Sequence, residues 1–217
     1  MPNKPADIQV GKSSPAWMMT YSDLMTQLLI FFVMLFALSS ASVEEQLKEI
    51  KRRVDTYVAE SKLVEFVKTG IDEKGLVVSL QNKVMFDSGK AEIFEEAKKI
   101  LNNITAILLE YPNSVKIEGH TDNRPINTPE FPSNWELSTA RATNLTRYIV
   151  VDLKFPPERL SSAGYAEFHP VAPNDTEDNM ALNRRVDIVV SRLSLEQQKN
   201  IRMAKTKGRM DPFKKVE

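Results

Sequence analysis

Hydrophobic and polar positions follow three different patterns along the chain, and the first is a long apolar stretch near the N-terminus. No Lys or Arg occurs between Lys12 and Lys48, and residues 16–40 contain a single charged side chain, that of Asp23. As a helix, residues 17–39 of this stretch are roughly 34 Å long at about 1.5 Å per residue, enough to cross a hydrocarbon core of about 30 Å. The pattern predicts one transmembrane helix over residues 16–40.

A cleavable signal peptide is the alternative reading of this stretch. Its strictly apolar part covers only residues 28–38, basic residues precede it and small residues follow it. The hydrophobic residues begin well upstream of that part, however, and a signal peptide has no use for the carboxylate of Asp23. We therefore expect an uncleaved helix. Lys4 and Lys12 favour a cytoplasmic segment 1–15, which places the bulk of the chain outside the cytoplasm.

The second pattern is an apolar seam on a charged helix, within a segment that we bound at residues 41–69. The seam residues are separated alternately by four and three positions: Val43, Leu47, Ile50, Val54 and Tyr57. Two heptads are too few to predict a stable coiled coil. The helix could pack on its own domain, or it could pair with a copy or lie against the membrane and gate the span, and the spacing favours neither.

The third pattern, over residues 70–192, alternates between strand-like and helical segments. Strands are expected at 75–80, 83–86, 115–118, 162–165 and 185–191, and helices at 92–110 and 133–151. Ser133 and Glu136 form a capping box that predicts Ser133 as the N-cap of the second helix. The order predicts an α+β fold in which helices cover one face of a mixed sheet. Residues 193–217 are basic with little apolar pattern, and we expect a disordered tail.

Composition excludes several classes of function. The 29 Lys and Arg residues are balanced by 29 Asp and Glu, so no global field favours nucleic acid. The absence of cysteine excludes disulfides, thiolate metal sites and a cysteine nucleophile. His120 and His169 lack the spacing of a metal site, and no nucleophile triad, phosphate loop or acid/base pair of carboxylates stands out. We expect neither an enzyme nor a resident metal or cofactor.

The candidate chemistry of the apolar helix lies at Asp23. An ionised Asp near the centre of a bilayer costs about 2.5–3.5 kcal/mol and is usually functional, although a position near the interface would keep it hydrated. Polar residues gather at the same end of the span as candidate channel-lining groups: Tyr21, Ser22, Thr26 and Gln27. A carboxylate in this place can bind and release H⁺ or Na⁺. One helix cannot enclose an ion path, so a larger membrane partner is implied.

Five ordered motifs in the third part resemble the OmpA-like peptidoglycan-binding domain. They are FDSGKAEI (86–93), IEGHTDNRPI (117–126), SNWELSTARA (133–142), GYAEFHPVAPNDT (164–176) and NRRVDIVV (183–190). The insert between GHTD and SNWELS resembles that of flagellar motor stator subunits, and the apolar segment 15–40 is similar to the single span of the MotB family. The resemblance covers residues 14–192.

The resemblance implies roles for individual residues. Asp23 matches the aspartate that binds the coupling ion, and the 41–69 segment takes the position of the plug that blocks the channel before assembly. Asp122 and Arg141 match the pair that grips the diaminopimelate group of the stem peptide. The flanking motifs add further peptidoglycan-binding candidates: Thr121, Leu137, Asn183 and Arg184. Met180 stands where the family often has Arg, which puts the edge of the glycan site in doubt.

The chemistry of Asp122 and Arg141 agrees with that role. Diaminopimelate presents an ammonium and a carboxylate on one carbon, so a carboxylate and a guanidinium held a few ångströms apart are complementary to it. A structural salt bridge between the two side chains is the alternative.

The function that the resemblance implies is that of a stator subunit in the bacterial inner membrane, acting in motility and chemotaxis. It would anchor the stator to peptidoglycan and form an H⁺ or Na⁺ channel with a MotA-like polytopic partner, two copies of this chain within five of the partner. Residues 15–17 and 20–23 resemble sodium-type stators somewhat more than the proton type, although one carboxylate can serve either ion. The alternative is a wall anchor of the OmpA type that the helix merely tethers to the membrane. A helix that serves only as a tether would favour Leu or Val over Asp at position 23.

Overall fold

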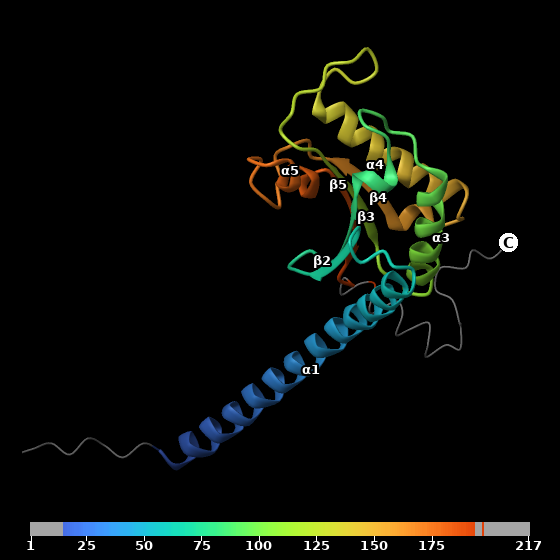
Figure 1. Ribbon diagram of the computed structural model, residues 1–217. Helices are drawn as coiled ribbons and strands as arrows, with labels where there is room; N and C mark the ends of the chain where they lie inside the picture. The colour runs from blue at the N-terminus through green and yellow to red at the C-terminus, as the bar shows by residue number, and fades with distance from the viewer. Residues whose placement is uncertain (1–14, 194–196, 198–217) are drawn as a thin grey trace, which may run out of the picture. The chain divides into compact units, whose positions relative to one another are not determined.

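Figure 1 shows the computed structural model of the chain, in which residues 15–193 and residue 197 are described. The predicted segment 1–15 and tail 193–217 therefore lie almost entirely outside the described residues, as does the side chain of Val43. The chain divides into two compact units, residues 1–42 and 43–217. Helix α1 (Ala16–Glu60) contributes residues to both.

The first unit contains the predicted apolar helix. Within the described part of the chain, Ala16–Ala37 is the one stretch of helix long and apolar enough to cross a membrane, with a mean hydropathy of 1.5. Its large side chains are exposed, including Trp17 at 64% and Phe36 at 74%. A helix that is apolar all round is stable when lipid or neighbouring membrane helices cover it. The surface of this segment is therefore that expected of a transmembrane helix.

The second unit is built on a five-stranded sheet in the order β1-β2-β5-β3-β4. The strands are β1 (Val67–Ile71), β2 (Gly75–Gln81), β3 (Val115–His120), β4 (Leu160–Gly164) and β5 (Arg185–Ser191). Strands β3 and β4 are parallel and the other neighbours are antiparallel, so the sheet is mixed, as predicted. The register places Ile188 of β5 between Val78 of β2 and Ile117 of β3, and all three are buried on the core face.

Three helical segments cover that face of the sheet. Helices α3 (Glu95–Leu109) and α4 (Asn134–Val151) and residues 43–60 of α1 contribute to one hydrophobic core (Figure 1). Leu47, Ile50 and Val54 are completely buried there, and Tyr57 packs at the edge. Of the two alternatives for the apolar seam, packing on its own domain is confirmed. The boundary that we placed at residue 70 thus divides a single packed unit.

The ends of the elements agree with the predicted signals at one helix and differ elsewhere. The N-cap of α4 is Ser133, whose Oγ accepts a hydrogen bond from Trp135 N at 3.2 Å and donates one to Glu136 at 2.5 Å. Of residues 83–86, predicted as a strand, 83–85 instead lie in the short helix α2 (Asn82–Met85), because four alternating residues fit either structure; Phe86 is extended and forms a β-bridge with Ile93. Three further elements were not predicted, because they are too short or too polar for a clear periodicity. They are the 3₁₀ helix η1 (Pro157–Arg159), edge strand β1 and the seven-residue helix α5 (Glu177–Asn183).

Candidate functional site

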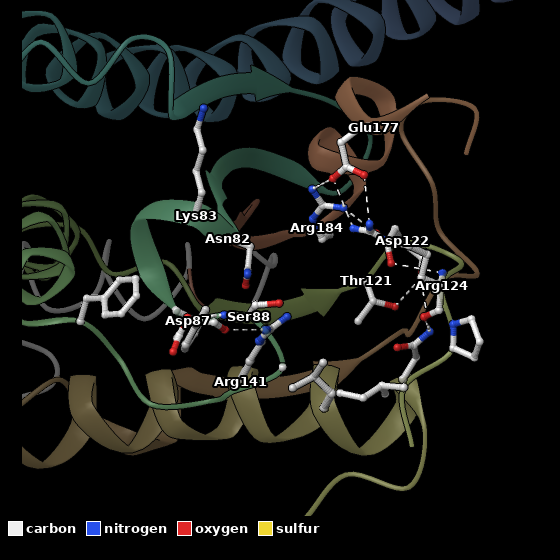
Figure 2. A pocket seen from close by; sticks show the side chains of 17 residues that line it. Asn82, Lys83, Asp87, Ser88, Thr121, Asp122, Arg124, Arg141, Glu177 and Arg184 are labelled. Atoms are coloured by element: carbon white, nitrogen blue, oxygen red, sulfur yellow. Dashed lines mark hydrogen bonds and ion pairs between the residues drawn. The ribbon is translucent and has the colours of Figure 1, made fainter. Parts of the chain in front are cut away.

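A cavity of about 580 Å³ opens at the end of β3, where the chain leaves the sheet at Thr121 and Asp122 (Figure 2). Its walls come from α2 and the turn that follows, the loop after β3, the first two turns of α4 and the two ends of α5. The charged side chains that line it are Lys83, Asp87, Asp122, Arg124, Arg141, Glu177 and Arg184. Because cationic and anionic groups both face the cavity, it suits a ligand that carries both charges.

Close packing of α4 against the sheet fixes the two sides of this cavity. A Cβ atom on Gly119 of β3 would lie 2.1 Å from the carbonyl oxygen of Ser138, so only glycine permits this approach. At the start of the helix, Asn134 Nδ2 donates hydrogen bonds to the carbonyl oxygens of Asp122 at 3.3 Å and Arg124 at 3.0 Å. The loop after β3 and the helix are therefore held in one arrangement.

The carboxylate of Asp122 is buried and accepts hydrogen bonds from two guanidinium groups. Its Oδ2 accepts from Arg184 Nη1 at 2.6 Å and from Arg124 Nε at 2.9 Å, while its Oδ1 accepts from the backbone N–H of Arg124 at 3.2 Å. Both arginines also reach Glu177, at 2.6 Å from Arg184 and 3.0 Å from Arg124. The hydrogen bond from Arg184, followed by the charges of both arginines, holds the pKa of Glu177 below its usual value. The carboxylate of Asp122 thus lies within a network of alternating charges.

Arg141 reaches the cavity from α4 and is held by backbone carbonyl groups. Its Nε donates to the carbonyl oxygen of Lys90 at 2.8 Å and its Nη2 to that of Asp87 at 3.3 Å, and its guanidinium lies 5.3 Å from the centre of the Phe86 ring. Burial lowers the pKa of Arg141 to about 10, with the charge of Arg184 acting in the same direction. The group is still cationic at neutral pH. Among the described residues, no acceptor pairs with its Nη1, and no ion pair joins it to Asp122.

Five of the six predicted peptidoglycan-binding residues line the cavity: Thr121, Asp122, Leu137, Arg141 and Arg184. The sixth, Asn183, does not. Its side chain is fully buried, where Oδ1 accepts hydrogen bonds from the backbone N–H groups of Val171 at 2.8 Å and Ala172 at 3.0 Å. The prediction of a ligand contact was wrong for this residue, which instead holds the loop that precedes α5.

Sequence reasoning missed Arg124, Glu177 and Lys83 as cavity residues. Arg124 stands two positions after Asp122 within a motif that was recognised, so an Asp-x-Arg spacing in a loop was a usable signal. Glu177 had no such signal, since it meets Arg124 only because a loop and a helix 53 residues apart converge.

The two histidines form part of a ring cluster outside this cavity. His120 stacks on Tyr165 with ring centres 5.4 Å apart, and Tyr165 in turn contacts His169 at 4.5 Å. Burial, followed by the charge of Arg185, lowers the pKa of His120 to about 3, so its ring is neutral. No group of residues in the described part of the chain has the arrangement of a metal site.

In the first unit, the polar residues around Asp23 lie as the helical spacing predicts. Gln27 Nε2 donates to Asp23 Oδ2 at 3.4 Å, which places both side chains on one face. Thr26 Oγ1 donates to the carbonyl oxygen of Ser22 at 2.8 Å, and Tyr21 is 53% exposed. The carboxylate therefore has a polar neighbour along the exposed face of an otherwise apolar helix.

Two family patterns match separate parts of the chain. Residues 85–184 match the OmpA family, and residues 3–54 match a pattern described as membrane MotB of the proton-channel complex MotA/MotB. The first match contains every residue that lines the cavity except Asn82 and Lys83. The second contains Asp23 and most of the apolar seam.

Two relatives from Bacillus subtilis match most of the chain. An uncharacterized protein of Bacillus subtilis, YtxE, is 34% identical over 84% of this chain and 90% of its own length. Motility protein B of the same organism is 35% identical over 69% of this chain, which spans 58% of that relative.

Solved structures share the fold. A putative MotB-like protein from Desulfovibrio vulgaris covers 70% of this chain and 98% of its own at 26% identity, with a TM-score of 0.65. The cell wall anchor of the T6SS from Pseudomonas aeruginosa covers 65% of this chain and 98% of its own at 30% identity, with a TM-score of 0.59.

Proposed function

Because the chain belongs to the MotB family, in which an apolar N-terminal helix precedes an OmpA-like domain, we propose that it is a stator subunit of a bacterial flagellar motor. In this proposal the helix spans the inner membrane with its N-terminus in the cytoplasm, and the second unit binds peptidoglycan outside it. The family points to a protein that binds the cell wall rather than to an enzyme.

The observation that carries the wall-binding half is the convergence of Asp122 and Arg141 on one cavity without pairing with each other. A diaminopimelate residue carries an ammonium and a carboxylate on one carbon. Asp122 can accept hydrogen bonds from the ammonium, and the Nη1 edge of Arg141 can donate to the carboxylate. Both protein groups are buried and held in place, so binding requires little reorganisation of either.

Cosedimentation of the full-length protein, in detergent, with purified peptidoglycan tests this half. We expect Asp122→Asn and Arg141→Lys to lower the bound fraction, because lysine lacks the planar fork of donors. Asp178→Asn and Arg147→Lys are matched controls, since both residues are exposed and neither lines the cavity. Equal binding by the Asp122 and control variants would exclude this site.

The channel half of the proposal is carried by Asp23. Its carboxylate would bind and release a cation at the interface with a MotA-like polytopic partner, because one exposed helix cannot enclose a pore. Each charge that crosses 100 mV releases about 2.3 kcal/mol, which is sufficient to drive repeated cycles. Two copies of this chain with five partner subunits would complete the complex.

Swimming by cells that carry Asp23→Asn as their sole copy tests the channel. We expect motility to be lost while membrane insertion and peptidoglycan binding are retained; Asp7→Asn is the control. Swimming by the Asp23 variant would leave only the tethered wall anchor. Swimming speed measured against external Na⁺ at fixed pH then identifies the ion, for which we favour Na⁺.

A further inference from the structure

Two large aromatic side chains lie exposed and stacked against each other at the N-terminus of α4. Trp135 is 48% exposed and Phe168 is 61% exposed, and their ring centres are 5.3 Å apart with planes inclined by 24°. Scattered single apolar residues are ordinary on a protein surface, whereas paired rings of this size present a flat apolar face that is typical of a binding site. We call the two side chains the aromatic platform.

The backbone under the aromatic platform is held firmly. Ala166, two residues before Phe168, is fully buried and has a φ of 48°, a conformation that alanine rarely adopts. Its N–H donates to Ser138 Oγ of α4 at 3.1 Å, and its carbonyl oxygen accepts from the N–H of Thr121 at 2.9 Å. Such strain persists only where the surrounding structure fixes it, so Phe168 has a defined place against α4.

The platform adjoins residues that line the candidate cavity, although neither of its two rings lines the cavity itself. Trp135 directly follows Asn134, which lines the cavity, and the segment that carries Phe168 is hydrogen-bonded to Thr121, which also lines it. Consecutive Cα atoms are about 3.8 Å apart, so the backbone that carries Trp135 lies directly beside the wall of the cavity.

We propose that Trp135 and Phe168 form a carbohydrate subsite that binds one pyranose ring of the peptidoglycan glycan strand. This inference rests on the proposed wall-binding function. A diaminopimelate residue is joined to its sugar through two amino acids and a lactyl group, which extend at most roughly 10–14 Å. A sugar ring must therefore lie near any stem peptide bound in the cavity. The C–H face of a pyranose is apolar and matches a flat aromatic surface.

The test compares two ligands that differ only in the sugar. One is the bare stem tripeptide containing meso-diaminopimelate, and the other is the same peptide attached to its disaccharide. Binding of each to the full-length protein in detergent is measured by calorimetry. We expect the sugar-bearing ligand to bind wild type about five- to tenfold more tightly than the bare peptide.

The variants separate the platform from the cavity. Trp135→Ala and Phe168→Ala should remove the preference for the sugar-bearing ligand and leave the affinity for the bare peptide unchanged, while Trp135→Phe should retain part of the preference. Val151→Ala is the control, because Val151 is a 55% exposed apolar residue at the other end of the same helix. It should behave as wild type.

Four outcomes would overturn the inference. If wild type binds both ligands equally, or if Trp135→Ala weakens both to the same extent, the platform binds no sugar although the cavity still binds peptide. If Trp135→Ala instead lowers the mass of the protein complex in sedimentation, the platform joins two copies of the chain. If neither ligand binds wild type, the proposed function fails together with the subsite.

Discussion

Replacing Ile50 by alanine would measure how firmly the second half of α1 is bound to the domain that follows it. Ile50 is completely buried in the same core as the sheet. Loss of a fully buried isoleucine side chain to alanine costs about 2–5 kcal/mol, because both the transfer free energy and the packing around the cavity are lost. For a domain of this size, 1 kcal/mol corresponds to roughly 2–4 °C in melting temperature. We expect Ile50→Ala to lower the melting temperature of the second unit by about 5–15 °C.

The assay is thermal unfolding of the full-length protein in detergent, followed by circular dichroism of the sheet and by pulse proteolysis. Lys48→Ala is the matched control, since Lys48 lies on the same helix with a side chain that is 64% exposed, and alanine preserves helix propensity. A melting temperature for Ile50→Ala within about 1 °C of that of the control would refute the reasoning. It would mean that residues 43–60 are not part of the cooperative unit.

Further predictions concern the packing and ionisation of the second unit. Gly119→Ala should prevent α4 from docking, because the added Cβ would lie 2.1 Å from a carbonyl oxygen, and an expression test should show much less soluble folded protein. Gly70→Ala is the control in the same test, since no atom lies within 4 Å of its added Cβ. Asn183→Ala should lower the free energy of unfolding in urea by about 1–3 kcal/mol, since two part-buried backbone N–H groups lose their acceptor, and an unchanged value would contradict the assigned role. The pKa of His120 lies near 3 in the folded protein, well below that of a free histidine, so the unfolded chain binds a proton at about pH 6.5 and the folded chain does not. Its contribution to stability should therefore fall by up to about 1.4 kcal/mol for each pH unit between 6 and 3. In urea titrations, the free energy of unfolding of wild type relative to that of His120→Phe should fall with the pH through this range, and a constant difference would contradict the assignment. Burial raises the pKa of Asp187, whose Oδ2 lies 3.4 Å from His120 Nε2, and this acts in the opposite direction as the pH falls, so the net loss of stability should be smaller than that from His120 alone.

The regular parts of the fold were predictable because their patterns are local. Strand β2 is rich in valine and leucine and strand β5 in valine and isoleucine, and the N-cap of α4 is encoded within four residues. Strand β1, with its Lys, Thr and Gly, carries no such pattern and is recognisable only from its pairing with β2. The apolar seam of residues 43–57 could be recognised from its spacing. The surface on which it packs could not, since that core is completed by strands far away in sequence.

The candidate site was predictable only in part, for the same reason. Asp122 and Arg141 stand in recognisable motifs, whereas the ion pairs of Arg124 and Arg184 with Glu177 arise from the meeting of separate segments. Asn183 shows the opposite error. Its place beside Arg184 in a recognised motif suggested a ligand contact, although the side chain points into the loop of residues 171–174.

Arg141 is oriented by main-chain oxygens of the turn at residues 87–90, not by acidic side chains. Every amino acid supplies the same carbonyl group, so that turn is free to change its sequence over evolutionary time without moving the guanidinium. Gly89 is the exception, because its φ of 68° disfavours residues with a Cβ. The guanidinium can thus keep its place in the cavity while the side chains of the turn at its rim vary.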